Sequence, residues 1–237
     1  MKNLTLESIT LRLEQPSDYR ETENLTREAF WNHYVPGCDE HYLLHIMRGS
    51  AAFVPELDFV ALYNGRIVGN AVCAKSVIKT DDENECEVLG IGPISVLPEY
   101  QSKGIGGRLL ELVKQTARDM EYRAIFLYGD PEYYSRYGFV AAENYDIRTA
   151  DNMYAEAHQV CELYEKALSG ITGRYFEDKV YEIDGTAAAE FDKAFPPKKK
   201  IEGTASQKRF LELVGSRKER TRQRQSIASF HCNIEKP

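Results

Sequence analysis

Residues 94–108 read Ile-Ser-Val-Leu-Pro-Glu-Tyr-Gln-Ser-Lys-Gly-Ile-Gly-Gly-Arg and join a β-branched segment to an amphipathic segment that begins at Leu109. The pattern predicts a strand, a short polar turn with glycines, and then a helix. A helix start leaves backbone N–H groups unpaired, and the helix dipole adds partial positive charge there. Glycines keep side chains away from those groups, so the segment predicts a binding site for phosphate. The anion we expect is the pyrophosphate of a nucleotide-containing cofactor.

Two common phosphate-binding motifs fit this segment poorly. A P-loop ends in Gly-Lys followed by Ser or Thr, whereas Lys103 precedes the glycines here and no Ser or Thr follows them. A dinucleotide fingerprint needs a third glycine at a fixed spacing after Gly104 and Gly106, and none stands there. A nicotinamide-dependent oxidoreductase is therefore disfavoured.

Two segments carry a resemblance to a known family. Residues 101–106 match Gln-x-x-Gly-x-Gly, and residues 127–139 read Leu-Tyr-Gly-Asp-Pro-Glu-Tyr-Tyr-Ser-Arg-Tyr-Gly-Phe. In this order and separation they resemble GNAT N-acyltransferases, and within that superfamily the YhbS-like group. The resemblance covers residues 1–150 and extends more weakly through 175–200. It implies an α+β GNAT fold, with a central mixed β-sheet flanked by helices and a C-terminal α/β appendage.

The resemblance implies acetyl-CoA, or a close analogue, as co-substrate, and no metal. It assigns the pyrophosphate to the loop and the first helical turn, and the thioester oxygen to backbone N–H groups of the preceding strand. Arg108 adds positive charge or, as an equal alternative, is solvated on the helix face. The residues carried over for cofactor binding are Ile94, Ser95, Val96, Gln101, Lys103, Gly104, Ile105, Gly106, Gly107 and Arg108.

Acyl transfer from a thioester to an amine needs a neutral amine and a proton for the departing thiolate. The resemblance assigns the proton donor to Tyr134, the first residue of a Tyr-x-x-x-Gly-Phe motif, with Tyr133 as the neighbouring alternative. The candidate general base is Glu87, upstream on the strand before the loop. Glu85 shares its face under strict alternation, and a solvated surface carboxylate is the alternative interpretation for both.

Composition indicates a globular enzyme. The chain has 237 residues, a net charge of −7 and five cysteines without a C-x-x-C pair, which favours reduced thiols in the cytoplasm over a disulfide framework. Apolar runs fall short of the ~20 residues that span a bilayer, and the N-terminus lacks the apolar block of a signal peptide. We expect no membrane partner.

The charge is unevenly distributed. Residues 198–237 carry eleven Lys or Arg and four Asp or Glu, a net of +7, which leaves −14 on residues 1–197. An acidic body suits a basic acceptor such as an amine, but ordinary solubility is the favoured explanation. The basic segment 217–224 lacks interleaved aromatic residues, so nucleic-acid binding is disfavoured relative to a solvated terminus.

His41 and His45 would share a helix face, but no further ligands complete a metal site.

Periodicity predicts the order of the elements. Strands are expected at 4–13, 59–63, 66–78, 87–96, 124–128 and from 139, and the Asn64-Gly65 turn predicts a hairpin. Helices are expected at 17–31, 40–48, 105–120, 130–137, 156–168, 191–197 and 207–214, with a strand or hairpin at 174–183. We divide the chain into a GNAT domain at 1–150, an extension packed on it at 151–215, and a basic tail at 216–237.

The sequence thus predicts an N-acetyltransferase that moves an acetyl group from acetyl-CoA to a primary amine of a small molecule or peptide, directly within a ternary complex. A catalytically weak acyl-CoA-binding regulatory protein is the alternative from another class. The acceptor, the acyl length and the role of residues 155–237 stay open, as does a homodimer.

Overall fold

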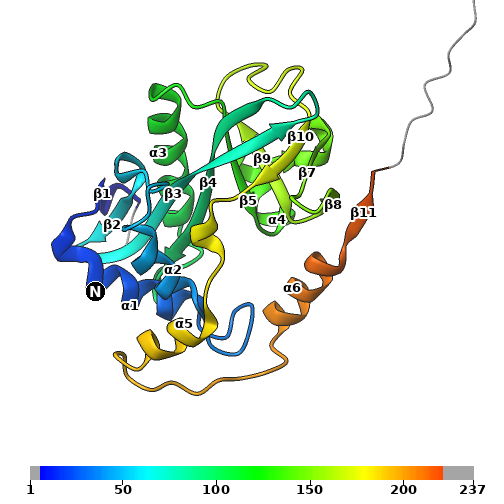
Figure 1. Ribbon diagram of the computed structural model, residues 1–237. Helices are drawn as coiled ribbons and strands as arrows, with labels where there is room; N and C mark the ends of the chain where they lie inside the picture. Colours follow the sequence, from blue (N-terminus) through cyan, green and yellow to red (C-terminus); the bar gives the residue numbers. More distant parts are fainter. Residues whose placement is uncertain (1–5, 221–237) are drawn as a thin grey trace, which may run out of the picture.

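Two long antiparallel strands, β3 (Arg66–Thr80) and β4 (Glu85–Val96), form the centre of the protein in this computed structural model, which describes residues 6–220. Within that range the main sheet has nine strands, and β4 pairs in parallel with β5 (Ala124–Tyr128), which makes the sheet mixed (Figure 1). The other strands of this sheet are β1 (Ile9–Leu13), β2 (Phe59–Tyr63), β6 (Val140–Ala141), β7 (Ile147–Arg148), β9 (His158–Glu162) and β10 (Gly173–Phe176).

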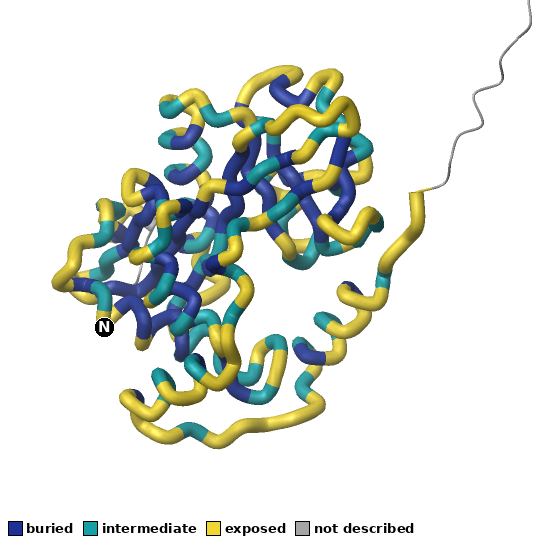
Figure 2. The backbone as a smooth tube through the Cα atoms, viewed as in Figure 1, coloured by how far each residue is buried: buried dark blue, intermediate teal, exposed yellow. Residues whose placement is uncertain are grey.

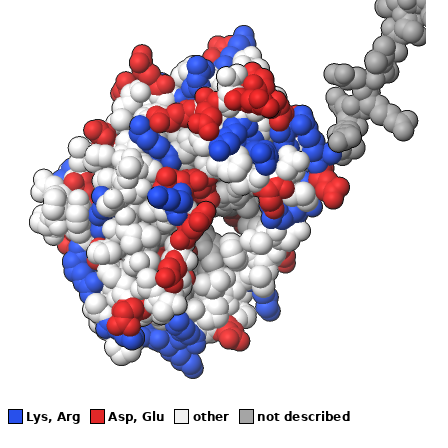
Figure 3. Space-filling model, viewed as in Figure 1, with Lys and Arg blue, Asp and Glu red and all other residues white. Residues whose placement is uncertain are grey.

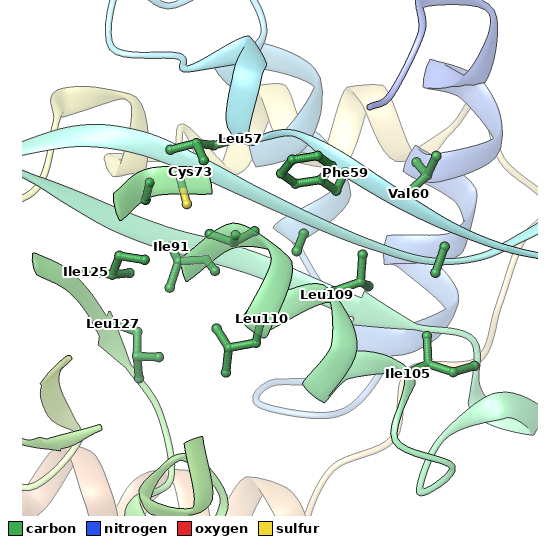
Figure 4. Close-up of a cluster of buried hydrophobic side chains, with 14 of the residues drawn as sticks. Leu57, Phe59, Val60, Cys73, Ile91, Ile105, Leu109, Leu110, Ile125 and Leu127 are labelled. Carbon is green, nitrogen blue, oxygen red and sulfur yellow. The ribbon is translucent and has the colours of Figure 1, made fainter. Parts of the chain in front are cut away.

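The two faces of the sheet carry different helices. The helix α3 (Ile105–Asp119) covers one face, because its apolar residues recur at helical spacing and are almost fully buried. On β4, Ile94 and Val96 pack into this core, whereas Ser95 between them points to the other face and donates a hydrogen bond to Thr26 of α1 (Tyr19–Phe30). Figure 4 shows α3 side chains Ile105, Leu109 and Leu110 against Leu57, Phe59, Val60, Cys73, Ile91, Ile125 and Leu127.

The pairing of β4 with β5 is short. Their register contains only Leu89 opposite Ile125 and Gly90 opposite Phe126. Beyond Gly90, β4 continues to Val96 along β3 alone, and its ladder with β3 is shifted between Ala71 and Cys73. The sheet therefore opens between β4 and β5 on the side that leads into the glycine-rich loop.

The C-terminal extension wraps around the edge of the domain. After β10 the chain passes a 3₁₀ turn at Lys179–Tyr181, the helix α5 (Gly185–Asp192) and an extended stretch to α6 (Ala205–Gly215). The strand β11 (Arg217–Glu219) then pairs with β8 (Met153–Ala155) in a separate two-stranded sheet. Figures 1 and 2 show this extension along the outside of the molecule, with α6 mostly exposed and set apart from the central sheet.

Most predicted elements are confirmed with small shifts of their ends, including α2 (Glu40–Met47), the short helix α4 (Pro131–Tyr134) and α6. The helix predicted at 156–168 is wrong, because His158–Glu162 forms β9 and pairs antiparallel with β5. The helix predicted at 191–197 instead ends at Asp192, ahead of the prolines. Of the tail predicted at 216–237, residues 217–219 form β11, and residues 221–237 lie outside the described range.

Candidate active site

The first turn of α3 presents unpaired backbone donors. Gly104 adopts a left-handed conformation with φ of 81° and accepts the first helical hydrogen bond, from the Arg108 N–H at 3.1 Å. The N–H groups of Ile105, Gly106 and Gly107 precede that bond, so they have no partner within the helix. Together with the helix dipole they form a site suited to an anion.

Tyrosine side chains from the α4 region stand over these glycines. A Cβ atom added to Gly106 would lie 3.1 Å from the Tyr133 hydroxyl, and one added to Gly107 would lie 2.6 Å from the Tyr137 ring. The glycines therefore allow a close approach of the helix start to the α4 segment. Any side chain at position 107 would displace the Tyr137 ring, so this close approach requires glycine.

The polar side chains of the loop mainly hold the loop itself. Gln101 Nε2 donates to the Val96 carbonyl at 2.9 Å, and Lys103 Nζ donates to the Glu99 carbonyl. Arg108 Nη1 donates to the Ile9 carbonyl at 3.0 Å, so this guanidinium reaches toward β1. The backbone N–H groups are therefore the donors that the loop offers to an anion, while these three side chains are engaged with backbone carbonyls.

The opening between β4 and β5 exposes further backbone donors. Leu97 N–H donates to Val68 O at 3.0 Å, and residues of an antiparallel ladder alternate in the direction of their N–H groups. The backbone N–H of Ser95, opposite Asn70, therefore points toward β3. The N–H groups of Ile94 and Val96 point away from β3, to the side where β5 has diverged. Two of the three predicted strand residues thus direct their N–H groups into the opening.

Tyr134 lies at the end of the opening. Its ring packs so closely on Gly129, just after β5, that a Cβ atom there would lie 2.3 Å from the ring. The ring also meets Tyr133 edge-on at 4.9 Å and Phe139 at 5.8 Å. Burial raises the pKa of the Tyr134 phenol well above its usual value, so the hydroxyl is protonated at neutral pH. Within residues 6–220 this hydroxyl has no hydrogen-bond partner, which leaves it available as a donor.

Glu87 lies far from the opening between β4 and β5 and from the glycine-rich loop. Its carboxylate pairs with Lys75 at 3.3 Å and lies in a surface hollow with Met120 and Tyr122, at the C-terminal end of α3. Nine residues of strand separate Glu87 from Val96, about 30 Å at ~3.3 Å per residue. The prediction of Glu87 as the base therefore receives no support from the geometry.

The extension supplies residues that the sequence did not indicate. On α6, Arg209 binds Asp130 and Phe210 packs on Tyr34 with ring centroids 4.9 Å apart. After β10, Tyr181 donates a hydrogen bond to the Gly92 carbonyl of β4 at 3.3 Å. In the space-filling view a hollow lies near the centre of the face, with Asp and Glu side chains at its edge (Figure 3).

The histidines of α2 have protein partners. His41 Nε2 lies 3.1 Å from an Asp192 carboxylate oxygen, and His45 Nδ1 lies 2.9 Å from Glu23. Across residues 6–220, no group of three or more His, Cys, Asp or Glu side chains could hold a metal ion. In the same range no helix is long and apolar enough to cross a membrane.

A sequence model described as an acetyltransferase (GNAT) domain matches residues 10–142. The match covers more than half of the chain, so the chain belongs to the GNAT family of acetyltransferases and is an acyltransferase. The matched region runs from β1 through the opening, the α3 loop and α4, and so includes the predicted binding residues and Tyr134.

Two bacterial relatives share this region. The chain is 27% identical over 164 residues to YhbS of Escherichia coli K12, an uncharacterized N-acetyltransferase, which covers 69% of this chain and 92% of YhbS. It is 30% identical over 107 residues to the uncharacterized N-acetyltransferase YjhQ, covering 45% of this chain and 59% of YjhQ.

Solved structures agree with the fold. A crystal structure of E. coli YhbS in complex with CoA has a TM-score of 0.67 and 25% identity, covering 78% of this chain and 97% of YhbS. A GNAT acetyltransferase of Brucella melitensis in complex with acetyl-CoA has a TM-score of 0.58 and 26% identity, covering 73% and 97%. The predicted fold class, a mixed sheet flanked by helices, is confirmed.

Proposed function

We propose that this protein is an N-acetyltransferase that transfers the acetyl group of acetyl-CoA to a primary amine of a small molecule or peptide. The observation that carries the proposal is the opening of β4 away from β5 beside the unpaired N–H groups of the α3 N-terminus. The CoA and acetyl-CoA complexes of the two similar solved proteins support it.

Different backbone groups would bind different parts of acetyl-CoA. The N–H groups of Ile105, Gly106 and Gly107 would hold the pyrophosphate, with Lys103 adding positive charge. The N–H groups of Ile94 and Val96 would donate hydrogen bonds to the thioester oxygen and stabilise the oxyanion that develops there. Gln101 supports this arrangement from the side, since its amide fixes the Val96 carbonyl.

Tyr134 would supply the proton that the departing CoA thiolate needs. A phenol is a weaker acid than a thiol, so the transfer depends on close placement, and the packed ring fixes the phenol in one position. The amine attacks the thioester directly in a ternary complex, and no side chain becomes acylated.

Acidic side chains at the hollow suit a cationic acceptor (Figure 3). We place the activity in the cytoplasm, because Cys38, Cys73, Cys86 and Cys161 are all free thiols.

A direct assay tests the proposal. The protein is incubated with acetyl-CoA and a panel of polyamines, amino sugars and lysine-bearing peptides, and released CoA is followed by a thiol reagent while acetylated amine is identified by mass spectrometry. We expect acetylated amine in equal amount to released CoA for at least one acceptor, and a strong loss with Tyr134→Phe. Binding of acetyl-CoA without transfer to any amine would favour the regulatory alternative.

A further inference from the structure

The C-terminal extension contacts the candidate active site through α6, which lies outside the residues 10–142 that match the GNAT domain. Arg209 of α6 binds Asp130, with its Nε 2.9 Å from Oδ2. Asp130 begins α4, and Tyr134, the proposed proton donor, is the last residue of that helix. The extension therefore touches the segment that carries the proposed chemistry.

The start of α6 is fixed to the turn that follows α1. The Asn32 carbonyl accepts hydrogen bonds from Gln207 Nε2 at 3.2 Å and from Thr204 Oγ1 at 3.3 Å. The Asn32 side chain accepts from the Ile201 N–H at 3.0 Å and donates to the Lys199 carbonyl at 3.1 Å. These hydrogen bonds hold α6 against the segment between α1 and α2, while Arg209 holds it against α4.

Beside Arg209, α6 presents an aromatic ring to the segment between α1 and α2. The centroid of the Phe210 ring lies 4.9 Å from that of the Tyr34 ring, with an interplanar angle of 37°. Tyr34 also packs on Phe30 at 5.7 Å and on His33 at 4.5 Å. Tyr34 and Phe210 are both only partly buried, so this aromatic pair offers an apolar surface that a ligand can reach.

The aromatic pair is continuous with the candidate active site. Phe210 follows Arg209 in the chain, and Arg209 is bonded to α4 through Asp130. The pKa values agree with this placement. Burial, and then the charges of Glu40 and Asp130, raise the pKa of the Tyr34 phenol to about 12. Burial, and then Tyr34, raise the pKa of the Tyr134 phenol above its usual value. Such charge effects weaken with distance, so the two phenols lie in the same region.

The hollow of the space-filling view adjoins α6. Figures 1 and 3 share one view, in which the hollow lies between α6 and the chain that follows β10. Tyr181 of that chain donates to the carbonyl of Gly92, which lies beyond the last β4 residue paired with β5. A Cβ atom on Gly92 would meet nothing within 4 Å, so open space borders β4 at this point. The hollow therefore has the opening on one side and α6 on the other.

The packing of α6 differs from that of a helix that completes a hydrophobic core. Of its eleven residues, only Gln207 and Leu213 are buried, and Leu211 is 67% exposed. None of the three clusters of buried hydrophobic residues in the described part of the chain includes a residue of α6. Burial of apolar area thus gives little reason for holding α6 at α4, whereas a role in binding a substrate does.

We propose that α6 forms one wall of the acceptor site, and that Phe210 and Tyr34 bind the carbon skeleton of the acceptor. This inference rests on the proposed acetyltransferase function and names the acceptor class: a primary amine carried on an aromatic or other apolar group. The amino group lies at the thioester beside Tyr134, and the apolar group packs on the two rings. This packing removes apolar surface from water, which favours such an amine over a compact polar one.

Phe210→Ala tests the assignment with two acceptors, 2-phenylethylamine and ethanolamine. We expect the wild-type protein to have the lower KM for 2-phenylethylamine. The variant should raise that KM about 10-fold, as expected for the loss of a buried aromatic contact, with a much smaller effect on ethanolamine. The loss should appear in KM and not in kcat, and Phe210→Tyr, which keeps the ring, should restore the preference. A KM for acetyl-CoA within a factor of two of wild type shows that the variant is folded.

Leu211→Ala is the matched control, because it removes an apolar side chain of the same helix that is exposed to solvent. Its acceptor preference should equal that of the wild-type protein. An unchanged preference in Phe210→Ala, or no preference for 2-phenylethylamine in the wild-type protein, would overturn the assignment.

A binding measurement separates this inference from the proposed function. Calorimetric titration with 2-phenylethylamine in the presence of CoA should show binding to the wild-type protein and binding about 10-fold weaker to Phe210→Ala. Equal affinities, or no binding to the wild-type protein, would overturn the acceptor wall. Binding that depends on Phe210, without transfer to any amine, would support the wall and contradict the acetyltransferase activity.

Discussion

Arg209 of α6 binds the carboxylate of Asp130 through two hydrogen bonds, 2.9 Å from Nε to Oδ2 and 3.1 Å from Nη2 to Oδ1. Asp130 also accepts from the Glu132 N–H at 3.0 Å and so begins α4, the helix that ends at Tyr134. One carboxylate therefore connects the C-terminal helix to the segment that carries the proposed proton donor.

We expect Arg209→Ala to release α6 from the site. The Arg209–Asp130 pair is about one-third exposed to solvent, so global stability should change little. The stretch between α5 and α6 should become more sensitive to limited proteolysis, and the KM for the acceptor should rise more than that for acetyl-CoA. Lys208→Ala, at the exposed neighbouring position, is the control. Equal proteolysis rates for the two variants would show that the Arg209 contact does not hold α6.

Tyr134→Phe should lower kcat about 100-fold while the Kd for acetyl-CoA stays within a factor of two, because only a proton donor is lost. The ring keeps its packing against Gly129 and Phe139, so the melting temperature should be retained. The neighbouring Tyr133→Phe is the matched control, and its kcat should stay near the wild-type value. A larger loss in Tyr133→Phe would transfer the role to Tyr133.

Gly106→Glu should abolish acetyl-CoA binding in a folded protein. A Cβ at this position meets the Tyr133 hydroxyl at 3.1 Å, the end of a side chain on the surface, and Val96 Cγ2 at 3.7 Å, an ordinary contact, so the helix tolerates it. The added carboxylate stands where a phosphate is expected, and we predict a loss of more than about 100-fold in affinity, or ~2.7 kcal/mol. Gly185→Ala, where a Cβ meets nothing within 4 Å, should bind normally. Unchanged affinity in Gly106→Glu would contradict the assignment of the loop.

The free energy of unfolding should fall as the pH rises between the ordinary pKa of an aspartate and the raised pKa of Asp58 in the folded protein. This buried residue accepts a hydrogen bond from Asn70 at 2.9 Å, and burial together with the neighbouring Glu14 raises its pKa to about 8, from an ordinary value near 3.8. Between these values the folded state holds a proton that the unfolded state has lost, so raising the pH favours unfolding.

Asp58→Asn resembles the protonated acid and should flatten the decline in melting temperature from about pH 5 to pH 8. Each 1 kcal/mol recovered corresponds to roughly 2–4 °C for a chain of this size. The exposed Glu56→Gln should leave the decline as it is. If the melting temperature of Asp58→Asn follows the wild-type curve, Asp58 does not hold the proton.

The sequence predicted the parts of the site that local patterns determine. The glycine-rich turn, the helix after it and the strand at 124–128 follow from residue type and spacing over short windows, and the structure has them there. By contrast, 156–168 was predicted as a helix because Val160, Cys161 and Leu163 fit helical spacing. The segment forms a strand because it pairs with β5, a contact over thirty residues away in the chain.

The position of Glu87 relative to the opening could not be predicted from the sequence for a related reason. Alternation along one strand placed Glu87 on β4, but the opening between β4 and β5 is at the opposite end of that strand. Tyr181 reaches β4 beside the opening only because β10 pairs with β3 and the following turn brings its hydroxyl to the Gly92 carbonyl.

The measurement that tests the central claim most directly is a calorimetric titration of the purified wild-type protein with acetyl-CoA, with NAD as the control ligand. We predict saturable binding of acetyl-CoA at one site per chain with a micromolar Kd, and no heat of binding with NAD. A folded sample that binds no acetyl-CoA, or that binds NAD equally well, would contradict the proposed acetyltransferase.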